Sequence, residues 1–505
     1  MIAKLSGGTL TRDFTASIVV FLVALPLCMG IAIASGVPAE KGLVTGIIGG
    51  IIVGAISGSP LQVSGPAAGL AVIVFGMVQQ FGLNALGPIL AVAGLIQLLA
   101  GVLKLGQWFR AISPAVVHGM LSGIGVLIVA GQFHVMMDAK SKPHGLENIQ
   151  AIPGALMNLS PVSFGQTEAA FGIGILTILV MLGWEKLRPA KLKLIPGALL
   201  GVLAGSGIAG LLALGINHVE VPTSLLAALT VPSVADFARL SDPAMLATAL
   251  ALAFIASAET LLSAAAVDKM QDKVRANYNK ELRAQGIGNF LCGLCGAIPM
   301  TGVIVRSSAN VQAGAETRLS AIMHGFWLLA LVALAPALLR MIPLSCLAGV
   351  LVVTGWRLVN LKDVVHLYKS YGVLPALTWI GTFGTVVAVD LLAGVLVGLA
   401  LAALELVPHL GDIKGLKLKT SQAEVAGETE IDLVGKATFL SLPKLSASLD
   451  AAPETGPVTL KVGDLRHVDH TCIELIKDWI QRKARAGSKV SVEPPGGSLA
   501  HAFEH

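Results

Sequence analysis

Long apolar stretches separated by short polar segments fill this chain as far as residue 408. Several stretches reach the roughly 20 residues that a helix needs to cross the hydrocarbon core of a bilayer. Examples are residues 14–39, 111–137, 194–219, 319–339 and 370–389. Residues 42–103 contain no charged side chain, which leaves room for up to about three spans. The pattern predicts an all-α polytopic membrane protein.

Charge clusters and Gly/Pro positions divide this region into about fourteen hydrophobic segments. We predict them at 15–35, 43–58, 65–80, 87–103, 112–132, 169–185, 194–216, 245–267, 284–297, 302–313, 319–339, 342–356, 372–389 and 391–408. The third, after Pro60 and Pro66, and the tenth, after Pro299, are too short to cross a bilayer fully. Each is the third segment of its half. Short, interrupted segments in corresponding positions indicate the midplane site of a secondary transporter.

Lysine and arginine residues are distributed unequally between the two sides of the predicted membrane. With the N-terminus inside, the cytoplasmic loops carry most of them, at 104–110, 186–193, 269–283, 318 and 357–369. The other side has only Lys41, Lys140, Lys142, Arg239 and Arg340. By the positive-inside rule this places both termini in the cytoplasm, and we expect a multi-pass protein of a bacterial-type cell inner membrane. The first span, with Asp13 before it and no cleavage site after it, is expected to be retained.

The composition changes after Pro408. Between about residues 420 and 492, charged residues mix with short alternating apolar runs at 428–434, 458–462 and 489–492. Residues 473–480 instead show helical spacing. The pattern predicts a strand-helix-strand-helix-strand unit, a small cytoplasmic α/β domain over residues 420–495, after a transmembrane domain over residues 1–410.

Composition excludes several classes of protein. Hydrophobic residues make up 54% of the chain and charged residues only 13%, unlike a soluble domain. The net charge of +5 is modest and no basic run suits nucleic acid.

Cys292 and Cys295 form a C-x-x-C without histidines or a second pair, so we expect packing residues and no metal or cofactor. No nucleotide-binding glycine motif is present, and nothing in the spans assembles a nucleophile with a base, which argues against an ATP-driven pump and against an enzyme.

Residues 295–314 carry the most informative chemistry. Arg306 is the only charged residue between Arg283 and Glu316, in a stretch broken by Pro299, Gly302 and Gly314. A guanidinium at that depth costs at least about 2.5 kcal/mol unless it faces a cavity or a partner. The broken helix also offers free backbone N–H groups. Together these features predict an anion site.

Glu259 is the second intramembrane charge of interest. No other charged residue lies between Asp242 and Asp268. An unpaired carboxylate at this depth is by default a proton or ion relay. A static ion pair with Arg306, serving structure alone, is the alternative.

Four motifs in this order resemble the SulP (sulfate permease) family of anion transporters. They are Asp13-Phe-Thr-Ala-Ser before a span with Pro26, residues 58–68 (GSPLQVSGPAA), residues 279–289 (NKELRAQGIGN) and residues 302–317 (GVIVRSSANVQAGAET). The resemblance covers nearly the whole chain. The cytoplasmic tail resembles a shortened and diverged STAS domain.

The resemblance implies two inverted seven-helix repeats, at about 10–218 and 240–410, that form a mobile core and a gate with elevator-like movement, and commonly a homodimer. The anion is expected between the N-termini of the third and tenth helices. Such N-termini bind anions through free N–H groups and a partial positive charge. The candidate substrate-binding residues are Ser64, Gly65, Ala67, Ala68, Gly302, Val303, Ile304, Val305 and Arg306.

The coupling ion is inferred from the same resemblance. Members of the family commonly have an acidic residue at the position of Glu259, and Ser263 keeps a hydroxyl one turn later. Sodium-coupled bicarbonate relatives have an aspartate there and a threonine on the tenth helix, where this chain has Ile304 or Val305. Because sodium needs several hard oxygen ligands, proton coupling is preferred. Leu27 replaces a glutamine that follows the first-span proline in many relatives, which leaves Cys28 and Met29 as pocket or packing residues.

Other polar residues have structural explanations beside functional ones. Gln62, Thr301 and Ser307 can bind substrate or satisfy helix ends. Asp390 is read as the N-cap of the last helix and His118 as an interhelical contact.

In the tail, Thr471 matches the phosphorylatable hydroxyl of STAS domains and Asp469 is a helix cap; a capped loop without regulation is the alternative.

We therefore expect a secondary transporter of a small inorganic anion, of the sulfate or bicarbonate class, coupled to protons and embedded in the lipid bilayer. An uncoupled channel or exchanger and a sodium-coupled bicarbonate or dicarboxylate transporter are the alternatives. A nucleobase carrier shares the inverted seven-helix fold but needs polar groups that read a ring edge. Arg306 among small apolar residues argues against it.

Overall fold

The computed structural model describes residues 7–106, 113–142, 144–159, 165–192, 194–221, 226–271, 274–404, 418–425, 428–438, 441–453, 456–485 and 487–493. The last residues of the predicted final span, 405–408, lie outside this part of the chain, as do Arg110, Lys193 and Lys273 of the predicted cytoplasmic loops and residues 494–495 of the predicted tail domain.

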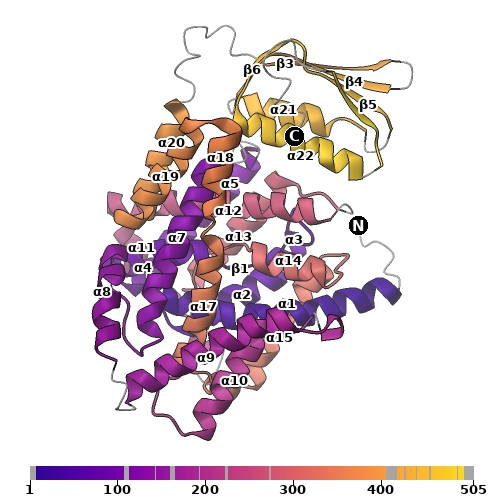
Figure 1. Ribbon diagram of the computed structural model, residues 1–505. Coiled ribbons are helices and arrows are strands. Elements are labelled where there is room, and N and C mark those ends of the chain that lie inside the picture. Colours follow the sequence, from indigo (N-terminus) through magenta and orange to yellow (C-terminus); the bar gives the residue numbers. More distant parts are fainter. Residues whose placement is uncertain are drawn as a thin grey trace. The chain divides into compact units, whose positions relative to one another are not determined.

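Each predicted hydrophobic segment corresponds to a helix (Figure 1). In the first half these helices are α1 (Gly7–Ala34), α2 (Ala39–Ile48), α4 (Ala68–Phe81), α5 (Leu86–Val102), α7 (Pro114–Val135), α9 (Gln166–Leu187) and α10 (Gly197–Leu211). In the second half they are α12 (Pro243–Met270), α13 (Tyr278–Leu294), α14 (Ile304–Gln312), α15 (Leu319–Leu334), α17 (Leu344–Leu358), α19 (Val373–Ala388) and α20 (Leu391–Leu404). Within the described residues, seven helices are long and apolar enough to cross a membrane, and five shorter ones are apolar.

Short elements connect these helices. A π-helical turn, η1 (Gly49–Val53), and α3 (Gly54–Ile56) continue α2. The other connecting helices are η2 (Leu83–Ala85), α8 (Gly145–Met157), η3 (Ala190–Leu192), η4 (Leu226–Ala228), α11 (Val234–Ala238), η5 (Arg239–Ser241), α16 (Pro336–Leu339) and α18 (Leu361–Tyr371).

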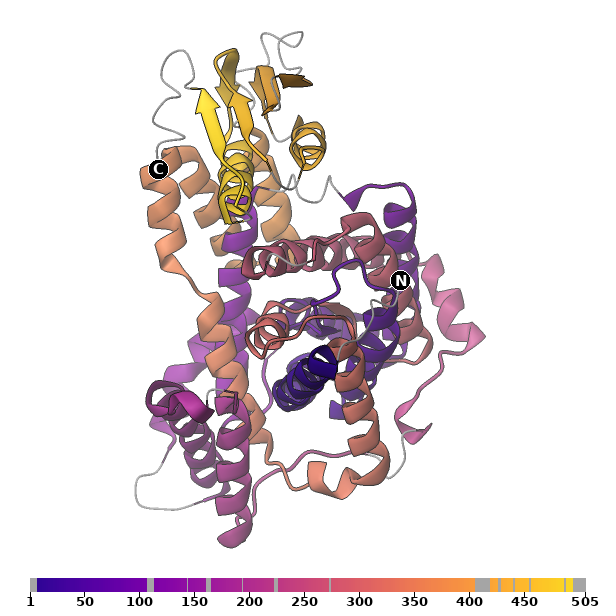
Figure 2. The ribbon, with the colours of Figure 1, turned by 90° about the vertical axis from the view of Figure 1, so that its right-hand side faces the viewer.

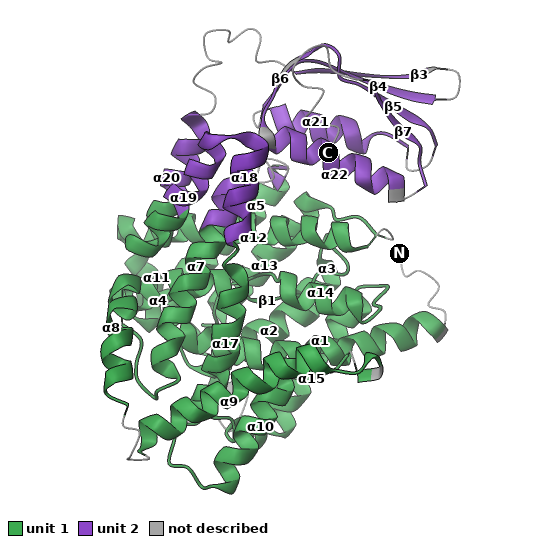
Figure 3. Cartoon of the chain, viewed as in Figure 1, with its two compact units in different colours: residues 1–103, 120–360, 383–394 green, residues 104–119, 361–382, 395–505 purple. Residues whose placement is uncertain are grey.

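The chain divides into two compact units, coloured separately in Figure 3. The first comprises residues 1–103, 120–360 and 383–394, and the second residues 104–119, 361–382 and 395–505. The first unit contains α1–α5, α8–α17, most of α7 and the parts of α19 and α20 that lie within residues 383–394. The second contains α18, parts of α7, α19 and α20, and the C-terminal strands and helices.

Helices of the two halves pack in reciprocal pairs within the first unit. Helix α1 packs on α14 and α15, and its counterpart in the second half, α12, packs on α4 and α5 (Figure 2). Likewise α2 with η1 packs on α15, while α13 packs on α5. These contacts of helices in one half are thus mirrored by their counterparts in the other half.

Glycines allow α5 and α13 to approach backbone to backbone. Gly87, Gly94 and Gly101 recur about two turns apart on α5, and Gly286 and Gly293 do so on α13. A β-carbon at Gly94 would lie 2.3 Å from the Phe290 nitrogen, and one at Gly286 would lie 2.4 Å from the Leu98 nitrogen. Small residues at such interfaces are how membrane helices gain close packing, since lipid supplies no hydrophobic drive between them.

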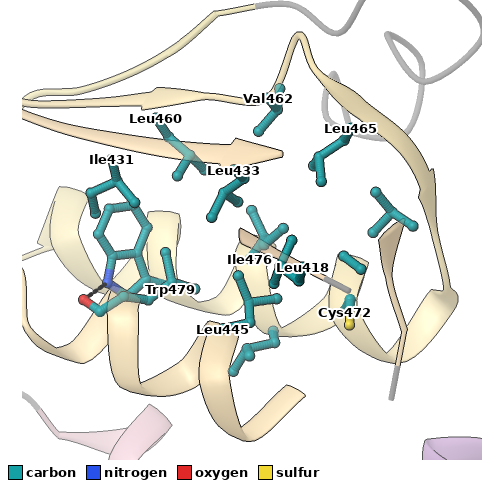
Figure 4. Close-up of a cluster of buried hydrophobic side chains, with 14 of the residues drawn as sticks. Leu418, Ile431, Leu433, Leu445, Leu460, Val462, Leu465, Cys472, Ile476 and Trp479 are labelled. Atoms are coloured by element: carbon teal, nitrogen blue, oxygen red, sulfur yellow. Dashed lines mark hydrogen bonds between the residues drawn. The ribbon is translucent and has the colours of Figure 1, made fainter. Parts of the chain in front are cut away.

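The C-terminal part of the second unit is a five-stranded sheet with two helices on one face (Figure 4). Its elements are β3 (Lys419–Val425), β4 (Glu428–Ala437), α21 (Leu442–Asp450), β5 (Val458–Lys461), β6 (Leu465–Val468), α22 (His470–Arg485) and β7 (Val490–Glu493). Strand β4 pairs antiparallel with β3 and parallel with β5 and β6, and β5 pairs parallel with β7. The predicted small α/β unit is confirmed, with β3 and β6 added to the expected order.

The sheet and its helices enclose one apolar core. Trp479 is a fully buried member of this core, and its indole Nε1 donates a hydrogen bond to the Leu449 carbonyl oxygen at 2.8 Å. Tyr371, at the end of α18, packs against this core and donates a hydrogen bond from its hydroxyl to Glu474 Oε1. Helix α18 is therefore tied to the C-terminal sheet.

The glycine contacts predict a test of the α5–α13 packing. Gly286→Val should destabilise the protein by about 1–3 kcal/mol, because the added atoms collide with the α5 backbone. The measurement is the temperature of half-unfolding in detergent. Gly172→Val is the matched control, since Gly172 is exposed on α9 and a β-carbon there meets nothing within 4 Å. Equal shifts in the two variants would contradict the packing explanation.

Candidate functional site: two paired helix N-termini

The two interrupted segments pair with each other in the interior of the first unit. Strand β1 (Ser64–Pro66) runs antiparallel to β2 (Met300–Gly302), with Ser64 opposite Gly302 and Pro66 opposite Met300. The Val303 N–H extends this pairing by donating to the Val63 carbonyl oxygen at 2.9 Å. Helices α4 and α14 begin directly after the strands. Inside a membrane, non-helical backbone must find partners within the protein, and each strand is the other's partner.

The helix starts leave backbone donors uncapped. The residues at the N-cap positions, Ala67 and Val303, are extended and make no side-chain capping bond. At an uncapped start, the first N–H groups have no acceptor within the helix. These are the N–H groups of Ala68 and Gly69 on α4, and of Ile304 and Val305 on α14.

The predicted substrate-binding residues therefore divide into two sets. Ser64, Gly65 and Gly302 lie in the paired strands, and the Gly302 N–H donates to Thr260 Oγ1 at 3.2 Å. The N–H groups of Gly302 and Val303 are thus occupied within the protein. Ala67, Ala68, Ile304 and Val305 lie at the helix starts, where donors are free. The structure brings both sets together at one place.

Arg306 lies on the first turn of α14 and is completely buried. Its guanidinium passes over β1: a β-carbon at Gly65 would lie 2.1 Å from Nη1, and Nη2 is 3.4 Å from the Pro66 carbonyl oxygen. Nε and Nη1 are buried without a hydrogen-bond partner in the described part of the chain. The site thus holds a positive charge with unused donors and no carboxylate beside it.

Glu259 approaches the other helix start. Its carboxylate oxygens lie 2.8 and 2.9 Å from where a β-carbon of Gly69 would be, on the first turn of α4. Oε2 is buried without a hydrogen-bond partner in the described structure. Ser263 is also buried, one turn further along α12. No ion pair joins Glu259 and Arg306, both of which are described, so the static-pair alternative finds no support.

Helix α13 holds both strands through a row of buried polar side chains one turn apart. Glu281 Oε2 accepts the N–H groups of Gly58 and Ser59 at 2.8 and 2.9 Å, in the loop before β1. Gln285 Nε2 donates to Ser64 Oγ at 2.7 Å. Asn289 bonds both backbone groups of Met300 in β2, accepting from the nitrogen at 2.8 Å and donating to the oxygen at 3.0 Å.

The Asn289 contact continues to the helix that carries Glu259. Asn289 Nδ2 also donates to Gln97 Oε1 at 2.7 Å, and Gln97 Nε2 donates to Ser257 Oγ at 3.2 Å. Ser257 lies on α12, two residues before Glu259. A continuous chain of buried hydrogen bonds therefore links β2 to the carboxylate-bearing turn of α12.

The remaining polar candidates near the strands bond within the protein. Ser307 Oγ donates to the Val303 oxygen and accepts from the Val63 nitrogen. Gln62 Nε2 donates to the Thr260 oxygen at 3.2 Å, and Thr301 Oγ1 donates to the Gly302 oxygen at 3.3 Å. Ser307 and Thr301 thus bond the backbone of the broken segments, whereas Gln62 bonds the backbone of α12 and its Oε1 is buried without a partner among the described residues.

Leu27, Cys28 and Met29 on α1 are buried, and the Cys28 thiol lies beside the Arg306 guanidinium. The other predicted residues lie outside this centre. Asp390 Oδ1 accepts the Ala393 N–H at 2.8 Å, which confirms it as the N-cap of α20. His118 Nδ1 contacts Asp363 Oδ2, an interhelical contact in the second unit as expected. Cys292 and Cys295 are free thiols.

In the tail, β6 ends and α22 begins at the predicted turn. Asp469 Oδ1 accepts the Cys472 N–H at 2.8 Å, the bond of a helix cap. Thr471 is 5% exposed. Burial raises the pKa of the adjacent Cys472 thiol, so this cysteine is not an activated nucleophile. A kinase would need this turn to open before reaching the Thr471 hydroxyl.

Comparison with known proteins decides the family. The model of the Sulfate permease family matches residues 10–382. The chain belongs to the sulfate permease family. The family and its curated relatives are transporters, which confirms that the protein is a membrane anion transporter and not an enzyme.

Relatives within the family have different stated substrates. The chain is 28% identical over 495 residues to a putative sulfate transporter, YvdB, of Bacillus subtilis, covering 95% of this chain and 91% of that one. It is 27% identical over 434 residues to the bicarbonate transporter BicA of a Picosynechococcus species, covering 83% and 74%.

Solved structures share the fold. The transmembrane domain of a cyanobacterial bicarbonate transporter BicA superimposes with a TM-score of 0.66 at 26% identity, covering 77% of this chain and 98% of that one. A murine Solute Carrier 26 family member A9 anion transporter in the inward-facing state gives a TM-score of 0.68 at 14% identity, covering 99% and 88%. The second comparison establishes similarity of fold alone.

Sequence reasoning did not assign a role to the α13 side chains or to His324, which is buried on α15. The sequence did carry a signal for the α13 side chains. Polar residues recur there at one-turn spacing (Glu281, Gln285 and Asn289), in a helix that continues into an apolar, glycine-rich run. Polar side chains on one face of a membrane helix normally have partners inside the protein. A lone histidine in an apolar span carries the same signal.

The Asn289 contacts predict a stability effect at the strands. Asn289→Leu should lower stability by about 1–3 kcal/mol for each Met300 backbone group left unpaired. Asn289→Asp keeps the acceptor for the Met300 N–H but turns a carboxylate oxygen toward the Met300 and Gln97 oxygens, so its loss should be at least as large. Thermal unfolding in detergent measures both. A leucine variant as stable as the wild type would show that these bonds do not hold β2.

Proposed function

We propose that this protein is a secondary active transporter of a small inorganic oxyanion, of the sulfate or bicarbonate class, coupled to protons. The observation that carries the proposal is the convergence of two uncapped helix N-termini and the buried Arg306 on the β1–β2 crossing. The other elements of the proposal rest on this centre.

An anion suits the donors at this centre. Four uncapped N–H groups, at Ala68, Gly69, Ile304 and Val305, come with the positive ends of two helix dipoles. Arg306 adds a full charge whose Nε and Nη1 have no acceptor among the described residues. A planar or tetrahedral oxyanion presents several acceptor oxygens to such donors. The sulfate and bicarbonate transporters among the relatives point to the same class.

Proton coupling is proposed for Glu259. Its carboxylate lies against the first turn of α4, so a negative charge there competes with an anion for the same helix dipole. Protonation removes that competition, and anion and proton then bind and move together. Ser263, one turn away, is proposed to stabilise the protonated carboxyl.

Sodium is the less favoured coupling ion. A sodium site needs several hard oxygen ligands in a tight shell. Ile304 and Val305 supply no side-chain oxygen, and the Thr260 hydroxyl already accepts the Gly302 N–H. Glu259 and Ser263 alone form an incomplete set.

We further propose fourteen spans arranged as two inverted seven-helix repeats. The reciprocal packing of α1 with α15 and of α12 with α5 supports this symmetry. The helices around the strands would form a core that moves against a gate, as in an elevator.

We propose an inner-membrane homodimer with both termini in the cytoplasm, a transport domain over residues 1–410 and a STAS-like domain over residues 420–495. Asp469 and Thr471 would then mark a regulatory turn.

Transport in proteoliposomes tests the main proposal. Uptake of labelled sulfate and of labelled bicarbonate is measured with and without an inward proton gradient, and again with a sodium gradient alone. We expect saturable uptake of one oxyanion that the proton gradient accelerates. Uptake driven only by sodium would favour the sodium-coupled alternative. Single-channel currents, or uptake indifferent to both gradients, would favour a channel or an exchanger.

Arg306 and Glu259 should give different phenotypes. Arg306→Gln removes the charge and should reduce oxyanion uptake by tenfold or more, since charged hydrogen bonds contribute about 1.5–3 kcal/mol. Glu259→Gln mimics the protonated carboxyl permanently. It should retain counter-flow of the anion but lose acceleration by the proton gradient. An unaltered response to pH in Glu259→Gln would contradict the coupling role.

Gly69 offers a test that leaves both charges in place. Gly69→Ala puts a methyl group within 3 Å of the Glu259 carboxylate, which must move away from the start of α4. We expect weaker proton-driven uptake with little loss of stability, because the end of a flexible side chain can yield. Gly76→Ala, further along the same helix where a β-carbon meets nothing within 4 Å, is the matched control. Identical uptake by the two variants would show that the position of the Glu259 carboxylate does not affect proton-driven anion uptake.

A further inference from the structure

A small cavity lies between α4 and α7, beside the end of α1 and the start of α8. Its volume of about 60 Å³ has room for a few water molecules or one small oxyanion. The residues of its lining that matter below come from α4, from α7 and from the segment before α8: Ala71, Val72, Phe75, Gln132, Ser141 and Lys142.

The cavity lies one turn beyond the uncapped start of α4. Helix α4 begins at Ala68, and Ala71 and Val72 follow about 5 Å further along its axis. In the proposed topology α4 runs from the middle of the membrane to its outer side, where Lys142 also lies. The cavity is therefore placed between the proposed anion site and the outer solution.

Gln132 brings an unused hydrogen-bonding group into this cavity. The side chain is only 3% exposed, and its Oε1 is buried without a hydrogen-bond partner among the described residues. Asn148, the other buried amide in the lining, is satisfied instead: it donates to the Lys142 and His144 oxygens at 2.9 and 3.1 Å and accepts the Lys142 N–H at 2.8 Å. Because an unpaired buried amide is costly, its place in a cavity points to a polar ligand.

The chemistry of an amide indicates which ligand fits. A glutamine side chain donates from its nitrogen and accepts at its oxygen. Bicarbonate presents the matching pair on one carbon, a hydroxyl that donates and an oxygen that accepts. Sulfate carries no hydrogen at neutral pH and would set an acceptor against Oε1. Lys142, which is exposed, adds a positive charge, and the described residues that line the cavity include no acidic one.

We propose that this cavity is an outer subsite of the transport path, in which Gln132 binds bicarbonate through both atoms of its amide. The bicarbonate hydroxyl donates to Oε1, Nε2 donates to a carboxylate oxygen, and Lys142 attracts the anion from solution. The subsite thus favours an oxyanion that carries a hydroxyl before it reaches the N-termini of α4 and α14. The inference rests on the proposed function and adds a selectivity step to it.

Unfolding temperatures in detergent test whether the Gln132 amide bonds to the protein. Gln132→Met nearly keeps the size of the side chain and removes its hydrogen-bonding groups. We expect no loss of stability in the absence of bicarbonate, because Oε1 has no bond to lose. Gln97→Met is the matched control: Gln97 is also buried but bonds Asn289 and Ser257, so this variant should unfold at a clearly lower temperature. Equal losses in the two variants would contradict an unpaired Gln132.

Labelling of a thiol in the cavity tests the ligand. Ser141→Cys places a thiol in the lining and leaves Gln132 intact. A membrane-impermeant thiol reagent is added outside proteoliposomes with bicarbonate, with sulfate or with neither, and the wild type gives the background of the native thiols. We expect saturating bicarbonate to slow the modification by about fivefold or more and sulfate to have little effect. Adding Gln132→Met should remove the protection.

A second thiol and a second background control this experiment. Ala139→Cys, exposed nearby but outside the lining, should react equally fast with either anion. Protection of Ser141→Cys that persists in Arg306→Gln would support a separate subsite, and if Arg306→Gln also leaves uptake intact, only the anion role of Arg306 fails. Protection lost in Arg306→Gln would place the anion at the helix N-termini alone, so that the subsite fails and the proposed function stands. Equal labelling with and without bicarbonate would show that the cavity holds only water and would overturn the inference.

Discussion

Two helices stop in the middle of a membrane domain, and the backbone groups they release must be satisfied without water. The fold resolves this by crossing the two broken segments as strands β1 and β2, each pairing with the other. Outer backbone groups of β2 are then taken up by side chains of α12 and α13: Thr260 accepts the Gly302 N–H, and Asn289 bonds both backbone groups of Met300. The backbone N–H groups at the starts of the following helices, α4 and α14, remain unpaired. The proposed anion site therefore consists of the backbone N–H groups that the described part of the protein leaves unpaired.

The five residues from Gly65 to Gly69 bring the two intramembrane charges to one segment of chain. Arg306 lies over Gly65 at one end, and Glu259 lies against Gly69 at the other. Both positions are glycines because a β-carbon would occupy the place of the charged group. Between the charges runs the start of α4, with its positive dipole end. A change in occupancy or protonation on one side thus alters the field on the other without any direct ion pair.

Close helix packing makes this arrangement rigid. Glycines on α5 and α13 bring the two backbones together, and α13 then places its three polar side chains under both strands. The same helix reaches α12 through Asn289, Gln97 and Ser257. Each of these side chains makes at least one buried hydrogen bond, and such bonds are electrostatically stronger in a low-dielectric interior than in water. The C-terminal sheet has its own core around Trp479 and is tied to α18 through Tyr371.

Four features could be predicted from the amino-acid sequence: the membrane class, the positions of the helices, the two interruptions and the small α/β tail. Each follows from local hydrophobic periodicity and from Gly and Pro positions. It also singled out Arg306 and Glu259, because a charge is costly in hydrocarbon wherever the chain takes it. Only the tertiary structure decided which backbone donors stay free, that the N–H groups of Gly302 and Val303 are used internally, and that the two charges face different glycines. It also decided the partners of Asn289. These are contacts between residues far apart in the chain, and local pattern carries no information on which distant group will satisfy a buried donor.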